Sequence, residues 1–115
     1  MQSAQAIRAL GALAQEHRLE AFRRLVQAGD TGLAAGALAE DLGVAASSMS
    51  FHLAQLAHAG LVTSRREGRS ILYAANYPAI QELVAFLYEN CCGEGSCSPV
   101  AAEPSAPKRK TRRVS

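Results

Sequence analysis

The stretch VAASSMSFHLAQLAHAGLV, residues 44–62, decides the fold. Met49, Leu53 and Leu56 recur at i, i+4 and i+7, which is the spacing of an apolar stripe on a helix that faces a core. Gly60 follows the last periodic position, as a glycine does where it caps a helix C-terminus. The sequence therefore predicts one amphipathic helix over about residues 44–59.

A shorter helix is predicted over residues 35–42, and it meets the longer one across the tight turn Gly43-Val44. Such a pair has the form of a helix-turn-helix, whose second helix lies in a DNA major groove. A helical hairpin of a small all-α protein has the same spacing, but no acidic residue lies between Asp41 and Glu67, and a surface that approaches phosphates needs that absence. We therefore predict DNA contacts from the outer face of the longer helix, by Ser47, Ser48, Ser50, Phe51, His52 and Gln55.

A β-hairpin is predicted directly after this helix. Residues 61–65 and 70–75 are rich in strand-forming side chains, and Gly68 supplies a turn between them. Arg65, Arg66 and Arg69 crowd the tip, where they are placed to contact phosphates or the minor groove beside the helix. The alternative is an ordinary solvated hairpin tip. For His52, a packed polar residue is likewise the alternative to a DNA contact.

Three further helices complete the predicted architecture, which is mainly α with a small β-hairpin, a winged helix-turn-helix. The first runs to about residue 15, and the second, residues 17–28, is predicted to turn Leu19, Phe22 and Val26 inward. The last begins at Tyr77-Pro78, with proline in the first turn. No further element follows it, so its apolar stripe needs either the first helix or a second chain as a partner, and we predict a homodimer through the first and last helices. That stripe consists of Ile80, Leu83, Val84 and Leu87.

Length and composition limit the class of protein. With 115 residues the chain forms one domain, which we expect over residues 1–92, followed by a cysteine-containing loop and a disordered basic tail over residues 93–115. Five of the 12 basic residues lie in that tail, so the net charge of +2 does not itself argue for nucleic acid. The first ten residues lack the basic and long apolar runs of a secretory signal, so we expect a cytoplasmic protein without a membrane partner. Lacking a nucleophile with a base, a phosphate-binding glycine loop or an acid pair, the chain is not expected to be an enzyme or to require a cofactor.

All three cysteines, Cys91, Cys92 and Cys97, lie in the segment NCCGEGSCS. Thiolates select soft ions, and in a reducing cytosol such a cluster is more often a ligand set than a structural disulfide. Zinc would need a fourth ligand, whereas trivalent arsenic and antimony take three thiolates in a pyramid. We therefore predict As(III) or Sb(III) as the inducer. The alternatives are a divalent cation such as zinc or cadmium, a dithiol redox switch, and a reactive cluster that arose by chance.

The segments LAEDLGVAASSMSFHLAQLAHAGLV and RREGRSILY resemble the patterns of the ArsR/SmtB family of metal-responsive winged-helix repressors. The run HRLEAFRRL is similar to the family's second-helix signature, and the resemblance covers residues 7–90. It implies a dimer built from the first and last helices. It also implies that the protein binds double-stranded operator DNA and releases it when an inducer binds.

Two metal sites of the family are missing from this sequence. Ala34, Ala35 and Gly36 stand where founding arsenic sensors carry Cys-x-Cys, and residues 77–90 contain neither the His nor the Asp of the zinc-sensing branch. The three-cysteine segment instead looks like that of the arsenical-responsive subgroup, whose site follows the last helix. We therefore expect an arsenite- or antimonite-responsive repressor that dissociates from DNA when three thiolates bind the metalloid.

Overall fold

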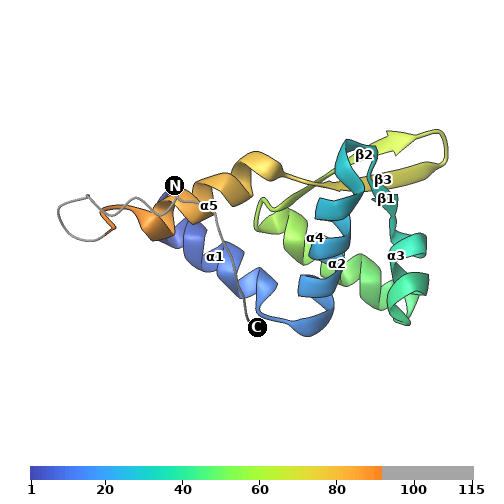
Figure 1. Ribbon diagram of the computed structural model, residues 1–115. Helices are drawn as coiled ribbons and strands as arrows, with labels where there is room; N and C mark the ends of the chain where they lie inside the picture. The colour runs from blue at the N-terminus through green and yellow to red at the C-terminus, as the bar shows by residue number, and fades with distance from the viewer. Residues whose placement is uncertain (92–115) are drawn as a thin grey trace, which may run out of the picture.

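The computed structural model describes residues 1–91. This part of the chain folds as a winged helix-turn-helix, with helices at both ends and a hairpin extending to one side (Figure 1). The predicted fold class is confirmed. In chain order the elements are α1 (Ser3–Leu13), α2 (Glu16–Ala28), a 3-10 helix η1 (Gly29–Thr31), β1 (Leu33–Ala34), α3 (Ala35–Leu42), α4 (Ala46–His58), β2 (Val62–Glu67), β3 (Ser70–Ala75) and α5 (Tyr77–Tyr88).

The core is formed where α2, α3 and α4 meet. Met49, Leu53 and Leu56 are fully buried, which confirms the stripe predicted for the longer helix. Leu25 of α2 and Leu38 of α3 are buried against them. Within residues 1–91 no polar or charged side chain is buried, so the hydrophobic effect holds this core together without internal polar pairs.

The ends of α4 follow their local sequence. Its first turn lacks a side-chain cap, because the residue at the N-cap is Ala45, and the helix starts at Ala46 rather than at residue 44. At the other end Gly60 takes φ +80°. Its N–H donates to the Ala57 carbonyl at 2.9 Å and that of Leu61 to the Leu56 carbonyl at 3.0 Å. These two bonds satisfy the last carbonyls and turn the chain into β2.

The inward face predicted for α2 is wrong by about one position. Phe22 is buried as predicted, but Leu19 is 44% and Val26 is 39% exposed. The buried neighbours of Phe22 are Ala21 and Leu25. Ala21 is small, and a larger side chain at this core position would separate the packed helices. The pattern of large apolar residues therefore gave no signal for Ala21 and pointed to Leu19 and Val26 instead.

The hairpin belongs to a three-stranded antiparallel sheet with the order β1-β3-β2. β2 and β3 pair from Val62 with Ala75 to Glu67 with Ser70, and Gly68 takes the positive φ predicted for the turn. The two-residue strand β1 was not predicted. It pairs Leu33 with Tyr73, and the preceding Gly32 lies so close to β3 that an added Cβ would be 2.5 Å from the Tyr73 carbonyl oxygen.

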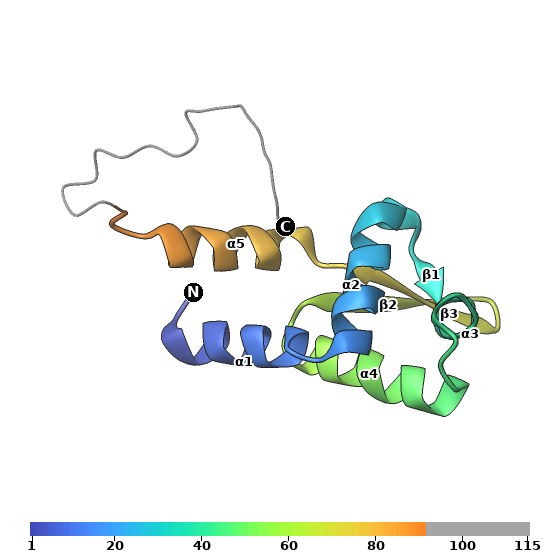
Figure 2. The same ribbon diagram turned by 60° about the horizontal axis from the view of Figure 1, so that its bottom comes forward.

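α1 and α5 lie together at the end of the molecule remote from the hairpin (Figures 1 and 2). Leu83 is only 4% exposed and packs within the protomer, so it is not available to a second chain. Other members of the predicted stripe point outward: Val84 is 48% and Leu87 59% exposed. Together with Ile7, Leu10 and Tyr88 they form the exposed apolar residues of these two helices, which we call the α1/α5 face.

Candidate nucleic-acid interface

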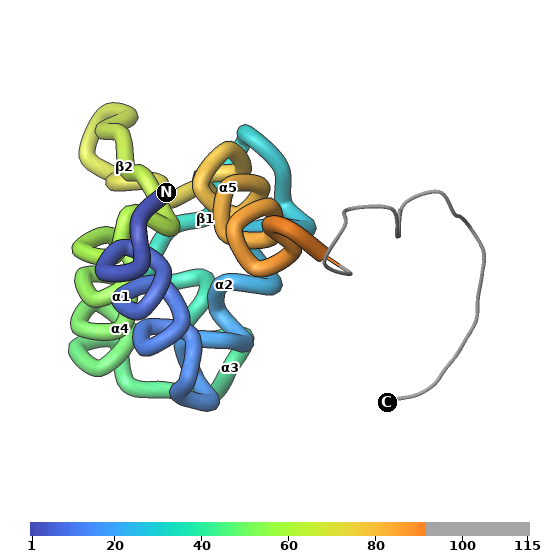
Figure 3. Tube along the Cα trace, turned by 90° about the vertical axis from the view of Figure 1, so that its left-hand side faces the viewer, coloured from blue at the N-terminus to red at the C-terminus, as the bar shows by residue number. Residues whose placement is uncertain are grey.

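The outer surface of α4 carries the side chains predicted to read DNA. Ser47, Ser48, Ser50 and Phe51 are exposed, and Gln55 is half-buried. The hairpin, α4 and α1 lie along one side of the molecule, while α5 lies on the other (Figure 3). This arrangement presents uncharged donors and acceptors beside an arginine-rich hairpin, which is the combination that base and phosphate recognition requires.

His52 differs from its neighbours because its ring packs against the start of α2. Its Nδ1 lies 3.4 Å from Nη1 of Arg18, and its ring centroid is 5.7 Å from that of His17. Burial lowers the pKa of His52 below its ordinary value, and the positive charges of Arg18 and His17 lower it further. The geometry matches a packed polar residue at the junction of α2 and α4; a DNA contact by His52 stays a prediction.

Acidification is expected to weaken this junction. A histidine whose pKa is lowered by folding is stabilising when neutral, so its contribution is complete above about pH 6.5 and is lost as pH falls below that value. We expect the free energy of unfolding to decrease below about pH 6.5, and to decrease less steeply in His52→Gln. Urea unfolding at a series of pH values above and below about 6.5 measures this free energy, and His58→Gln, at an exposed residue of the same helix, is the matched control. Equal slopes in the wild type and His52→Gln would contradict the assignment.

The three arginines of the hairpin are not equivalent. Arg65 is held by the protomer itself: its Nη1 and Nη2 donate to the carbonyls of Asp30 and Thr31 at 3.0 and 2.9 Å, and its Nε to Glu67 at 3.0 Å. These bonds tie the hairpin to η1 and fix its direction. Arg66 and Arg69 are exposed, and neither forms an ion pair within the described part of the chain. They are therefore the hairpin arginines whose charge is open to a phosphate.

Only one of the three predicted metal ligands lies in the described residues. Cys91 follows α5 in a turn, is half-buried, and donates its N–H to the Tyr88 carbonyl at 2.8 Å. Cys92 and Cys97 lie outside the described residues, as does the basic tail. Residues 1–91 contain no group of three or more His, Cys, Asp or Glu side chains that could hold a metal ion. Ala34 is the N-cap of α3, where the family's cysteine pair is missing.

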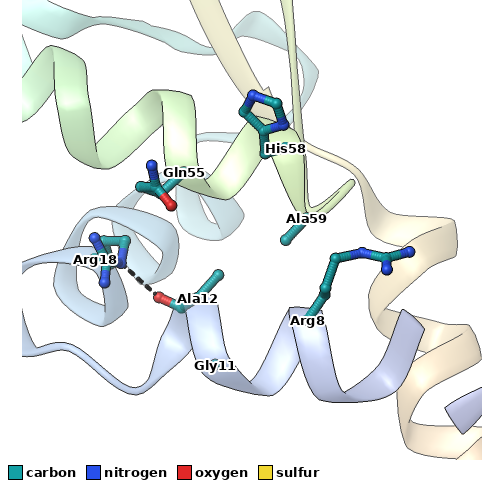
Figure 4. Close-up of a pocket in the computed structure, with 7 residues that line it drawn as sticks. All are labelled: Arg8, Gly11, Ala12, Arg18, Gln55, His58 and Ala59. Atoms are coloured by element: carbon teal, nitrogen blue, oxygen red, sulfur yellow. Dashed lines mark hydrogen bonds between the residues drawn. The ribbon is translucent and has the colours of Figure 1, made fainter. Parts of the chain in front are cut away.

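A second polar surface was not anticipated from the sequence. Side chains from α1, α2 and α4, including Arg8, Arg18 and His58, line one open pocket (Figure 4). Helical periodicity does place Gln55 and His58 on one side of α4. It carries no signal that α1 crosses at that point, because this contact joins segments far apart in the chain. No helix among the described residues is long and apolar enough to span a bilayer.

Comparison with known sequences agrees with the geometry. A family model described as a helix-turn-helix domain matches residues 13–65, from the end of α1 to the middle of β2. The transcriptional activator HlyU of Vibrio cholerae is 32% identical over 90 residues, which cover 78% of this chain and 81% of HlyU. HlyU is thus described as a regulator of transcription.

Solved structures place the chain in the same group. An ArsR-like transcriptional regulator from Rhodococcus is 31% identical with a TM-score of 0.67, over 73% of this chain and 76% of that protein. A homodimeric winged helix-turn-helix domain from Mycobacterium bovis is 26% identical with a TM-score of 0.62, and the match covers 83% of this chain and 88% of that domain. A protein described as a "possible transcriptional regulator for arsenical resistance" is 29% identical with a TM-score of 0.61, and the match covers 69% of this chain and 79% of that protein. The chain belongs to the ArsR/SmtB family of winged-helix transcriptional regulators and is not an enzyme.

Proposed function

We propose that this protein is a homodimeric repressor that binds operator DNA and releases it when arsenite or antimonite binds Cys91, Cys92 and Cys97. The observation that carries the proposal is the position of the cysteines, which begin within three residues of the end of α5. Three closely spaced thiolates suit a trivalent metalloid, which needs no fourth ligand. The relative described in connection with arsenical resistance supports the same inducer class.

In this proposal the dimer connects the cysteines to the DNA surface. α5 ends three residues before Cys91 and carries part of the α1/α5 face. We expect a change at the cysteines to shift this face and with it the distance between two protomers. Two recognition helices must lie about 34–36 Å apart to enter successive major grooves. A homodimeric neighbour with the same fold supports this assembly.

A thiol redox signal is the second candidate. One solved structure similar to this chain is described as reduced HlyU from Vibrio cholerae, with 32% identity and a TM-score of 0.60. The vicinal pair Cys91-Cys92 with the nearby Cys97 offers thiols that could oxidise instead of binding metalloid. A divalent cation such as zinc or cadmium is the third, and it would have to recruit a further ligand.

One titration separates these candidates. A duplex selected from random sequences by the purified full chain supplies the operator, and the complex is titrated separately with arsenite, antimonite, zinc, cadmium and a peroxide. We expect arsenite and antimonite to release the DNA at the lowest concentrations. Release by peroxide alone, reversed by a thiol reductant, would assign the redox function instead. If none of these agents releases the DNA, the cysteines are not the sensor.

The hairpin arginines provide an independent test of DNA binding. Arg69→Gln should weaken binding about equally on the selected and on random duplexes, and should lower the slope of log affinity against log salt by about one, because one phosphate contact is lost. Ser48→Ala should change sequence preference instead, because a serine on α4 reaches base edges. Fluorescence anisotropy at several salt concentrations measures both effects. Equal losses from both variants, without a change in preference, would contradict the docking.

A further inference from the structure

The pocket between α1, α2 and α4 has a volume of about 280 Å³ and is open to solvent (Figure 4). Small residues form its base, so the space between the helices is not filled by side chains: Gly11, Ala12 and Ala59. A Cβ added at Gly11 would meet no atom within 4 Å. The remaining lining side chains are all polar, and they are Arg8, Arg18, Gln55 and His58.

These polar groups share one chemistry. Two guanidinium groups, an imidazole and an amide can all donate hydrogen bonds, and among residues 1–91 no carboxylate lines the pocket. Arg18 and Gln55 lie at one end and Arg8 and His58 at the other (Figure 4). An adjoining pocket shares Arg8, His58 and Ala59 and is also lined by Glu82, so a carboxylate lies nearer the Arg8 end than the Arg18 end. Such a set of donors favours an oxyanion over a cation or a neutral ligand.

Arg18 is already held in place. Its Nε donates to the Ala12 carbonyl at 2.8 Å, and its backbone N–H donates to Oε1 of Gln15 at 2.9 Å. The guanidinium has five N–H groups, and within the described part of the chain only Nη1 approaches another side chain, at 3.4 Å from His52. Other N–H donors of the terminal nitrogens therefore remain for a ligand. A fixed guanidinium loses little conformational entropy when an anion binds, which makes the pocket a prepared site.

We infer that this pocket binds a phosphate group. The group can belong to a DNA phosphodiester or to a free phosphate ion, because both offer the same oxygens to the arginines. α1 and α4, which both line the pocket, lie on the same side of the molecule as the hairpin in Figure 3, and the lining residue Gln55 is also one of the predicted DNA contacts. Binding of a DNA phosphodiester in this pocket rests on the proposed function, whereas binding of a free phosphate ion does not.

The first experiment uses inorganic phosphate on the full chain without DNA. Titration followed by amide chemical shifts should give saturable changes at Gly11 and Gln55. We expect affinity to fall about tenfold or more in the double variant Arg8→Gln with His58→Gln, because two charge-assisted donors are lost. Both residues are exposed, so the fold should persist. The matched control is Arg23→Gln, an exposed arginine of α2 outside the pocket, which should bind phosphate as the wild type does.

The second experiment measures salt dependence of binding to a random duplex. A decrease of about one in the slope for Arg8→Gln, with none for Arg23→Gln, identifies DNA as the phosphate source. Saturable phosphate binding with an unchanged slope identifies the free ion. If phosphate shifts do not saturate and Arg8→Gln matches Arg23→Gln in slope, the inference is overturned. A wild type that fails to bind any DNA refutes the proposed function, and the phosphate titration then decides the pocket alone.

Discussion

Leu87→Glu is expected to turn the dimer into a monomer and to lower affinity for a two-half-site operator by about 10²–10⁴-fold. Leu87 is 59% exposed on α5, within the α1/α5 face, and a carboxylate there would have to be buried without a partner in the dimer. A monomer reads a single half-site and loses the gain from binding two linked sites at once. Sedimentation equilibrium and operator titration measure the two effects.

Two further variants make this result specific to the α1/α5 face. Leu19→Glu places the same charge at an exposed leucine of α2, 44% exposed, and should leave both assembly and operator affinity unchanged. Leu83→Glu alters a buried residue of the same helix and should unfold the protomer, which circular dichroism detects. If Leu87→Glu sediments as a dimer, or as a monomer that keeps operator affinity, the proposed interface is wrong.

Local patterns predicted most of the fold. Met49, Leu53 and Leu56 identified α4, and the glycines at 43, 60 and 68 marked the ends of α3, α4 and β2, because each of these signals acts within a few residues of chain. Contacts between distant segments were missed. β1 has two residues and no period to detect, and it exists because Gly32 allows the chain to approach β3. Whether a short strand such as β1 forms therefore depends on its tertiary contacts and not on its local sequence.

The candidate interface shows the same division. Exposure of Ser47, Ser48 and Phe51 follows from the helical period, so their placement on the outer face was predictable. The role of Arg65 was not, because its partners are carbonyls of Asp30 and Thr31, which lie more than thirty residues earlier in the chain. Composition and spacing identified the arginines of the hairpin. The fold was needed to distinguish Arg65, which orients the hairpin, from Arg66 and Arg69, whose charges can contact a phosphate.

Ser substitution at any of the three cysteines is expected to abolish release by arsenite while leaving operator affinity near that of the wild type. A hydroxyl does not replace a thiolate as a ligand for a soft ion, and the serine has nearly the same size, so the fold and the DNA surface should persist. Only Cys91 lies in the described residues, at the turn after α5. We expect metalloid binding to shift the end of α5 against the partner protomer and to favour a spacing that fits two half-sites poorly.

Linkage adds a quantitative requirement to this prediction. If arsenite lowers operator affinity by some factor, the operator must lower arsenite affinity by the same factor, because the two binding events share one thermodynamic cycle. Arsenite affinity measured on the free and the DNA-bound wild type therefore checks the coupling without any variant. Unequal factors at equilibrium would show that release is not caused by binding at a site coupled to the DNA surface.

The most direct measurement is an arsenite titration of the operator complex formed by the wild type and by the variant with Cys91→Ser, Cys92→Ser and Cys97→Ser together. Since no other cysteine exists in the chain, this variant has no thiolate left. We predict that arsenite releases the wild type and leaves the variant bound at every concentration tested. Release of the variant at the same arsenite concentration as the wild type would contradict the thiolate mechanism.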